Sequence, residues 1–225
     1  MVNNQLTKYM KNNKIKRYLR EGYIDAMLRQ TIYETNRLFL RILKPNYCRQ
    51  VLDYYKRNHN FLEEWEAKRP RDFYTLAYQR RQLSYEYNMF KSRKLIRFWI
   101  FKKEDNKLIG NTCLSNIVMG NFKSCYMGYK LDCDEINNGY MTEAIREVVK
   151  IMFDDYGLHR IEVNVVPRNE RSLKVMKKLN FEEEGYSKRY LEINGKWEDH
   201  VHFAIYEDAL TSFEMTPSSL SLVFA

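Results

Sequence analysis

The sequence has no long apolar run. Nowhere do its 225 residues contain the stretch of about eighteen apolar residues that a membrane-spanning helix requires. Its start, Met1-Val2-Asn3-Asn4, does not read as a signal peptide. We therefore expect no association with a membrane.

Cysteine is scarce and has no metal-binding spacing. The four cysteines, Cys48, Cys113, Cys125 and Cys133, form no CxxC pair and have no zinc spacing with the four histidines. Three of them fall in segments predicted to be strands or strand ends, where buried free thiols are common. We expect no metal site, and a reducing cytoplasm as the default location.

A basic excess accompanies a composition that can fold. Hydrophobic residues make up 44% of the chain, with 18 Tyr, 12 Phe and 3 Trp, which suits one α/β domain and excludes a disordered chain. The net charge of +9 favours anionic partners such as nucleotide phosphates, RNA or an RNA-rich particle. A basic surface in a Lys/Arg-rich proteome explains the charge equally well, because no Arg/Gly run or RNA-binding signature accompanies it.

The chain divides into three parts. Residues 1–34 form a basic N-terminal extension, residues 35–208 the folded domain, and residues 209–225 a loose C-terminal tail. Within the domain we predict the following order: a strand at 37–43; helices at 45–58 and 74–91, separated by an aromatic loop at 61–65; strands at 96–102, 108–118 and 124–131; a helix from Gly139 to Gly157; a strand at 160–166; a helix from Asn169; and a hairpin around Asn194-Gly195. This order predicts a single mixed α/β sheet with helices on both faces.

The loop before the helix at Gly139 is the first candidate site. Apolar residues at i, i+3, i+4 and i+7 spacing after Gly139 predict an amphipathic helix that covers a sheet. A short loop, Asn137-Asn138-Gly139, separates it from a strand that ends near Leu131. Backbone N–H groups in such a loop, with the positive end of the helix, form a cradle for an anion such as a pyrophosphate. Alone, this signal is weak.

Further motifs follow in a fixed order and carry a resemblance to a known family. They are residues 139–144 (GYMTEA), 159–161 (HRI), 169–172 (NERS) and 179–185 (LNFEEEG). With these motifs the sequence resembles the GNAT superfamily of N-acetyltransferases. Residues 61–66 (FLEEWE), 120–122 (GNF), 125–129 (CYMGY) and 195–200 (GKWEDH) make it similar to the bacterial ribosomal-protein-alanine N-acetyltransferases. The resemblance covers about residues 35–207.

The resemblance implies a fold and a cofactor. The GNAT fold is a central, mostly antiparallel sheet, splayed between the strand that ends at Leu131 and the strand that begins near Arg160, with helices on both faces. Its cofactor is acetyl-CoA. The cofactor-binding residues that the resemblance implies are Leu131, Asp132, Cys133, Ile136, Asn137, Asn138, Gly139, Tyr140, Met141, Thr142, Asn169 and Ser172.

The implied reaction is direct transfer from the thioester to an amine. Many relatives use a Tyr as general acid where this chain has Met176, and Ser172 is the alternative donor; a capping role for Ser172 is equally open. Glu66 or Glu192 could act as base through a water. Glu143 is better explained by the helix dipole. Cys133 has no His or Asp spacing that would activate it, which argues against a covalent acetyl-enzyme.

The acceptor side carries an aromatic wall. Phe61, Leu62, Trp65, Glu66 and Tyr129 are the predicted substrate-binding residues, although aromatics between two helices also serve to pack helices together. Tyr126 and Tyr129 alternate on one strand, so at most one of them faces the cleft.

Three functions remain open at this point. The leading hypothesis is acetylation of a protein N-terminal α-amine, an Ala or Ser of a ribosomal protein, with possible RNA contact through the basic surface. An acceptor end lined by Glu63, Glu64, Glu66 and Glu192 would instead favour a small amine: a polyamine, an aminoglycoside or an aminoacyl compound. The third function is a non-catalytic module that docks on ribosomal RNA. Its only support is two departures from the family pattern: Met176 replaces the general-acid Tyr, and Ile136 stands where relatives begin the loop with Gln or Arg.

A substitution in the loop tests the cofactor assignment. We expect Gly139→Asp to weaken the binding of acetyl-CoA, because the added carboxylate would meet the pyrophosphate. Calorimetric titration of the purified variant against the wild type measures the effect, and an unchanged affinity would contradict the assignment.

Overall fold

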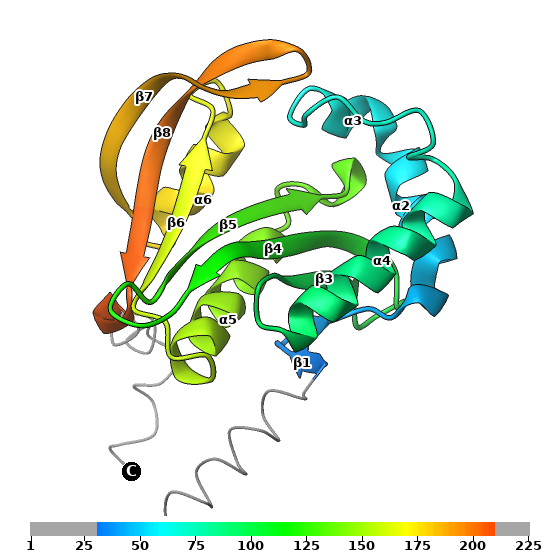
Figure 1. The fold of residues 1–225 in the computed structure, drawn as a ribbon, viewed down its shortest axis with the longest axis horizontal. Helices are drawn as coiled ribbons and strands as arrows, with labels where there is room; N and C mark the ends of the chain where they lie inside the picture. The colour runs from blue at the N-terminus through cyan, green and yellow to red at the C-terminus, as the bar shows by residue number, and fades with distance from the viewer. Residues whose placement is uncertain (1–30, 210–225) are drawn as a thin grey trace, which may run out of the picture. The chain divides into compact units, whose positions relative to one another are not determined.

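One eight-stranded sheet organises the chain. The computed structural model describes residues 31–209. The predicted N-terminal extension and C-terminal tail lie outside these residues, apart from residues 31–34 and 209. The sheet has the order β1-β2-β3-β4-β5-β6-β8-β7 (Figure 1). Its strands are β1 Ile32–Glu34, β2 Leu38–Arg41, β3 Ile96–Lys102, β4 Leu108–Val118, β5 Ser124–Leu131, β6 Arg160–Val165, β7 Glu182–Ile193 and β8 Lys196–Tyr206.

Five α-helices accompany the sheet in the described residues. They are α2 Cys48–Arg57, α3 His59–Glu63, α4 Leu76–Lys91, α5 Tyr140–Asp154 and α6 Glu170–Lys178, with 3-10 turns at Pro45–Tyr47, Cys133–Glu135 and Glu207–Ala209. None of them is long and apolar enough to span a membrane. The segment predicted as an aromatic loop is in fact partly helical, since Phe61 and Leu62 belong to α3. Leu62 is buried and its N–H bonds to the Asn58 carbonyl at 2.9 Å, which continues the helical path after α2.

The sheet is antiparallel except at one junction. β5 and β6 are parallel and pair at three positions only, ending with Tyr126 and Glu162. Beyond them β5 stays paired with β4 as far as Leu131, while β6 stays paired with β8 as far as Val165. The two strands therefore diverge, as Figure 1 shows. The predicted splayed, mostly antiparallel sheet is confirmed.

Helices cover both faces of the sheet. Trp99 and Phe101 of β3 pack in a core with residues of α2 and α4. Phe98 and Ile100 are also fully buried, and alternation along the strand places them on the opposite face. The predicted apolar stripe of α5 is buried along its length: Met141, Ala144, Ile145, Val148, Val149 and Met152. The expected layering is confirmed.

Two local signals are realised as predicted. Asn194 and Gly195 have φ values of 47° and 81°, the positive values of the two-residue turn that joins β7 to β8. The Asn169 side chain accepts a bond from the Ser172 N–H at 3.2 Å and so caps α6. Both signals act within a few residues, so the sequence alone could specify them.

The core offers a test of the fold. Trp99 is 2% exposed and lies edge-on to Tyr54 and Tyr55, with ring centroids 6.0 Å away in both cases. We expect Trp99→Ala to lower the free energy of unfolding by about 3–5 kcal/mol, because it opens a cavity in the core. Urea unfolding measures this loss. Trp197→Ala is the matched control: that side chain is 58% exposed and we expect a change of less than about 0.5 kcal/mol. Equal losses in the two variants would contradict the packing described.

Candidate active site

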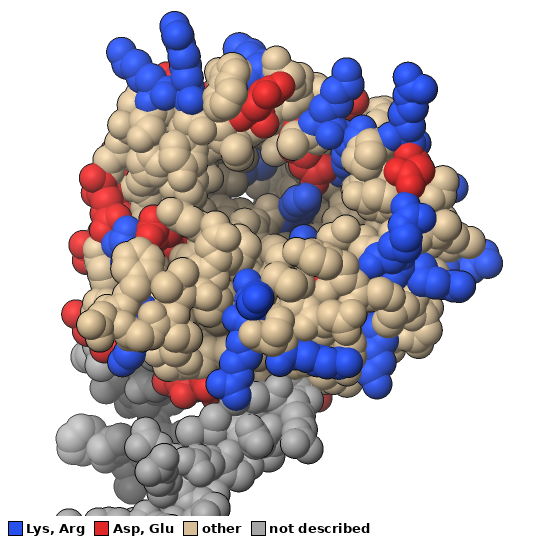
Figure 2. Space-filling model, viewed as in Figure 1, with Lys and Arg blue, Asp and Glu red and all other residues tan. Residues whose placement is uncertain are grey.

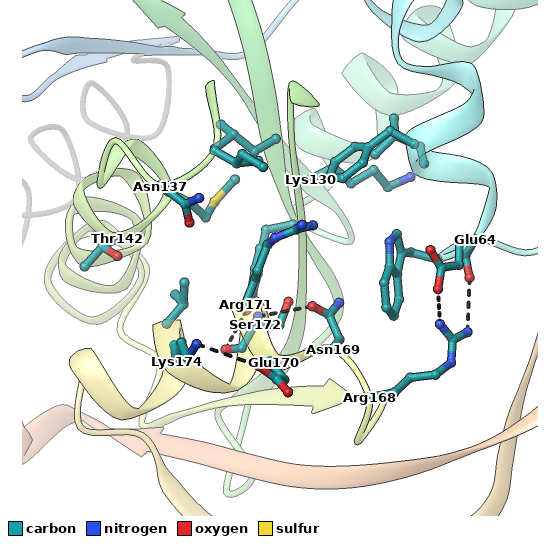
Figure 3. Close-up of a pocket in the computed structure, with 18 of the residues that line it drawn as sticks. Glu64, Lys130, Asn137, Thr142, Arg168, Asn169, Glu170, Arg171, Ser172 and Lys174 are labelled. Atoms are coloured by element: carbon teal, nitrogen blue, oxygen red, sulfur yellow. Dashed lines mark hydrogen bonds and ion pairs between the residues drawn. The ribbon is translucent and has the colours of Figure 1, made fainter. Parts of the chain in front are cut away.

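A cavity of about 780 Å³ opens where β5 leaves β6. Figure 2 shows this hollow with Lys and Arg side chains around it, and Figure 3 shows side chains that line it. The wall is built from α3 and the segment after it, the end of β5, the loop into α5, and the start of α6. The lining residues are Phe61, Leu62, Glu64, Trp65, Glu66, Tyr129, Lys130, Leu131, Ile136, Asn137, Gly139, Met141, Thr142, Arg168, Asn169, Glu170, Arg171, Ser172, Lys174, Val175 and Lys178.

Most of the predicted site residues meet in this one cavity. Those that line it are Leu131, Ile136, Asn137, Gly139, Met141, Thr142, Asn169 and Ser172 from the cofactor set, and Phe61, Leu62, Trp65, Glu66 and Tyr129 from the acceptor set. Those that do not line it are Asp132, Cys133, Asn138, Tyr140 and Glu192.

The loop between β5 and α5 presents backbone donors. Asn137 and Gly139 both have left-handed φ values, 63° and 77°. α5 begins directly afterwards, and the N–H groups of its first turn have no acceptor inside the helix. Met141 and Thr142 of this turn line the cavity. The arrangement suits an anion, because free N–H groups and the positive end of the helix dipole lie at the same place.

Asp132 and Cys133 hold the end of β5 from outside the cavity. The Asp132 carboxylate is buried and accepts a bond from Arg57 Nε at 2.6 Å. The Cys133 N–H donates to Asn58 Oδ1 at 2.9 Å, so it is already engaged. Burial, together with Asp134 and Asp132, raises the pKa of the Cys133 thiol. A protonated thiol outside the cavity is a poor nucleophile, consistent with direct transfer.

These three side chains, Asp132, Cys133 and Asp134, also form the one group in residues 31–209 whose potential metal-ligand atoms lie within 4.8 Å of one another. The Arg57 guanidinium already neutralises the Asp132 carboxylate. The contacts of this group therefore fix the end of the strand.

Glu143 is a structural residue of the first turn of α5. Its Oε1 accepts bonds from Thr35 Oγ1 at 2.6 Å and from the Arg37 N–H at 2.8 Å, and its Oε2 accepts one from Arg37 Nε at 2.7 Å. Partial burial acts to raise the pKa of Glu143, but these hydrogen bonds outweigh it and lower the pKa below its ordinary value. A carboxylate held ionised by three donors joins α5 to the turn between β1 and β2.

The surroundings of Gly139 change the reason why Gly139→Asp should weaken acetyl-CoA binding. A Cβ built on Gly139 would lie 3.5 Å from Arg37 Nη2 and near no other atom outside its own chain neighbours. The carboxylate of a Gly139→Asp variant would therefore face Arg37, not a pyrophosphate in the cavity. The expected weakening would instead arise because the new carboxylate competes for Arg37 and because an L-residue is strained at φ 77°.

The start of α6 brings a serine hydroxyl to the cavity wall. The Asn169 side chain caps the Ser172 N–H, and Figure 3 shows both residues at the head of the helix. The cap is the Asn169 side chain and not the Ser172 hydroxyl, which lies near the Tyr129 hydroxyl. The Tyr129 hydroxyl donates to the Ser172 carbonyl at 3.4 Å, and burial raises the pKa of Tyr129. Tyr126 lies outside the cavity wall, so only one of the two tyrosines faces the cleft, as expected.

The far end of the cavity is closed by contacts between distant segments. The Arg168 guanidinium pairs with Glu64, lies 3.2 Å from Glu198 Oε1 and stacks 4.5 Å from the centre of the Trp65 ring. Figure 3 shows Arg168 reaching across to Glu64. The hairpin adds a backbone bond from the Asn194 N–H to the Glu66 carbonyl at 2.9 Å. The α3 side of the cleft and the hairpin side therefore meet here.

The carboxylates of this end are neutralised. Glu64 pairs with Arg168, and Glu66 is ion-paired with both Lys130 and Arg69. Burial lowers the pKa of Lys130, while the charge of Glu66 acts in the opposite direction. The cavity is lined by three acidic residues (Glu64, Glu66, Glu170) and five basic ones (Lys130, Arg168, Arg171, Lys174, Lys178). Its charge balance is therefore basic.

Glu192 and Glu63 do not contribute to the wall. Glu192 lies on β7 opposite Trp197, is exposed and is not among the residues that line the cavity, and its role as a catalytic base stays a prediction. The register of β7 shifts between Ser187 and Leu191. Such a shift changes which side chains face the cleft, and it cannot be read from strand alternation.

α6 carries a basic face that was not predicted from the sequence. Arg171, Lys174 and Lys178 all line the cavity and follow i, i+3 and i+7 spacing, the signal that would have identified them. Arg168 and Lys130 had no comparable signal, because their partners Glu64 and Glu66 lie far away in the sequence.

Comparison with known proteins agrees with this geometry. A family model described as an acetyltransferase (GNAT) domain matches residues 37–182. The [ribosomal protein uS5]-alanine N-acetyltransferase of Escherichia coli (strain K12) is 35% identical over 184 residues, which is 81% of this chain and 92% of that protein.

Two solved structures share the fold. The ribosomal-protein-S5-alanine acetyltransferase from Vibrio fischeri has a TM-score of 0.76 and 33% identity, covering 80% of this chain and 98% of its own. Mycobacterium smegmatis RimJ, solved in complex with CoA-disulfide, has a TM-score of 0.74 at 24% identity, with 82% and 95% covered. The chain therefore belongs to the GNAT family and is an acetyl-CoA-dependent N-acetyltransferase.

Proposed function

We propose that this enzyme acetylates the α-amine of a protein N-terminus, an Ala or Ser of a ribosomal protein. The observation that carries the proposal is the closed, charge-neutralised end of the cavity, where Arg168 and Lys130 pair with Glu64 and Glu66. An uncompensated acidic groove would attract small polycations, whereas this end offers an amine an aromatic wall and no free carboxylate. The relatives from Escherichia coli and Vibrio fischeri, named as acting on alanine of a ribosomal protein, support the same acceptor class.

We assign acetyl-CoA to the cavity beside β5. The fit rests on its volume, on the free N–H groups at the start of α5 and on the basic face of α6. Loop residues 136–142 would hold the diphosphate through backbone groups, while Arg171, Lys174 and Lys178 add positive charge. Leu131, Asn169 and Ser172 would contact the pantetheine arm. Asp132, Cys133, Asn138 and Tyr140 do not line the cavity, so of these four only Asn138 and Tyr140, as backbone members of the loop, belong to the proposed diphosphate contact.

The chemistry required of the protein is modest. Acetyl-CoA supplies an activated acetyl group as a thioester. An α-amine has a pKa of about 7.7–8.0, so a useful fraction is neutral at pH 7 without a strong base. Backbone N–H groups at the divergence of β5 from β6 would stabilise the negative charge on the carbonyl oxygen during attack. We propose that the Ser172 hydroxyl relays a proton: it donates its proton to the departing thiolate and takes up the proton that the attacking nitrogen loses, so that the products are a neutral amide and a neutral thiol.

The basic surface fits a ribosomal destination. Lys and Arg side chains lie within the hollow and beside it in Figure 2, and the whole chain carries a net charge of +9. We propose that these cations bring the cavity to an N-terminus displayed beside RNA, with an attraction that weakens as salt rises.

The acceptor is tested by measuring thiol release from acetyl-CoA with four compounds. They are a peptide starting with Ala, the same peptide with a blocked N-terminus and an internal Lys, a polyamine, and an aminoglycoside. We expect turnover only with the free Ala terminus. Turnover with a small cation would overturn the acceptor while keeping the fold and the donor. Cofactor binding without turnover on any acceptor, ribosomes included, would favour the non-catalytic docking module.

Two variants, Ser172→Ala and Tyr129→Phe, test which of the two hydroxyls donates the proton to the thiolate. We expect Ser172→Ala to lower kcat by about 100-fold, because the thiolate loses its proton donor. Affinity for acetyl-CoA, measured by calorimetry, should stay within about twofold because the Asn169 cap uses the backbone of residue 172. Ser84→Ala, on α4 and outside the cavity, is the control for the loss of a hydroxyl.

Tyr129→Phe completes this test. It removes the hydroxyl that donates to the Ser172 carbonyl while keeping the ring. A large loss of kcat in Tyr129→Phe with unchanged turnover in Ser172→Ala would contradict the role proposed for Ser172.

A further inference from the structure

We propose that Arg37 is a positioning residue for the phosphate-binding loop: it holds the Asn138 carbonyl away from the cavity, so that the Gly139 N–H is turned toward it. This inference rests on the assignment of acetyl-CoA to the cavity. Arg37 lies in the turn between β1 and β2, about a hundred residues before the loop, and is not among the residues that line the cavity.

The Arg37 side chain contacts the loop at several points. Its Nη1 donates to the Asn138 carbonyl at 3.0 Å, and its Nη2 is the atom that a Cβ on Gly139 would approach at 3.5 Å. The guanidinium carbon lies 4.5 Å from the centre of the Tyr140 ring. A planar group with several donors can hold all these neighbours in one geometry, which the point charge of a lysine cannot do.

The Arg37 bond sets the orientation of the peptide plane between Asn138 and Gly139. All described peptide bonds are trans, so the carbonyl and the N–H of this unit point to opposite sides. The carbonyl points to Arg37, outside the cavity, and Gly139 itself lines the cavity. We therefore infer that the Gly139 N–H points toward the cavity, where it can bind an anion.

Glycine makes this plane easy to turn. Gly139 has no Cβ to restrict it, and its φ of 77° is one of several regions open to it. A flip of the peptide would replace an N–H donor with a carbonyl oxygen, which repels phosphate. The Arg37 bond to the Asn138 carbonyl opposes that flip.

Arg37 also cancels a charge that would otherwise oppose anion binding. Glu143 lies in the first turn of α5, whose N-terminus faces the proposed phosphate site. Arg37 binds both of its carboxylate oxygens, at 2.8 Å through the backbone and 2.7 Å through Nε. The pair is close to neutral, so the field of the helix N-terminus stays positive toward the cavity.

Shortening the donor tests the proposal. S-acetylpantetheine keeps the thioester and the pantetheine arm but lacks the nucleotide and its phosphates. In Arg37→Gln we expect the KM for acetyl-CoA to rise by about tenfold or more, because the loop loses a charged hydrogen-bond donor. The KM for S-acetylpantetheine should change by less than about twofold, and kcat at saturating donor should be unchanged.

Two further variants control for folding. Arg41→Gln removes a guanidinium from β2 that packs on Phe39 and Phe101, away from the loop, and should leave the ratio of the two KM values as in wild type. Arg37→Lys keeps the positive charge without the planar fork. We expect it to raise the KM for acetyl-CoA by less than Arg37→Gln does and to leave the KM for S-acetylpantetheine unchanged. Equal losses on both donors, or no change with acetyl-CoA, would overturn the proposal.

Equilibrium binding separates this outcome from failure of the proposed function. If the wild type does not bind CoA more tightly than pantetheine, the cofactor assignment itself is wrong. If the wild type binds CoA more tightly than pantetheine and Arg37→Gln does so to the same extent, only the role proposed for Arg37 is wrong. Neither measurement depends on the identity of the acceptor.

Discussion

β5 and β6 share only three residue pairs, and the rest of the site depends on where that pairing stops. After Tyr126 and Glu162 each strand remains bonded to its other neighbour, so the sheet stays intact while its middle opens. Backbone groups along the opening need partners, and a polar ligand can supply them. The loop 136–142 and the start of α6 lie at the same opening, which is why main-chain donors, helix dipole and basic side chains converge on one cavity.

The two ends of that cavity are built on different physical principles. At the donor end, backbone N–H groups are fixed by contacts made behind the loop, through Arg37, Glu143 and Arg57. At the acceptor end, side chains from distant segments close the wall, and each carboxylate there has a cationic partner. We propose that the first arrangement binds phosphate through the geometry of its backbone donors and that the second restricts which acceptors can enter. In the proposed arrangement, the thioester of acetyl-CoA lies between the phosphate-binding loop and the acceptor end.

Local order was well predicted from the sequence. The strands at 96–102, 108–118 and 124–131, the stripe of α5 and the Asn194-Gly195 turn all rest on periodicity or on a few adjacent residues. Most of the cavity lining followed from motifs. Glu192, which lies beyond the register shift between Ser187 and Leu191 in β7, is not among the cavity-lining residues, and its catalytic role stays a prediction. Arg37 and the Arg168–Glu64 pair could not be foreseen, since their contacts join segments about a hundred residues apart and leave no local pattern.

The central claim is that coenzyme A binds along the edge where β5 leaves β6. Amide hydrogen exchange with and without CoA tests it directly, residue by residue and without any acceptor. CoA should slow exchange at residues 127–131 and 136–142 and at the start of α6, and leave α2 and α4 unchanged. Protection on the α2 and α4 face, with residues 136–142 exchanging as fast as in the free protein, would contradict the claim.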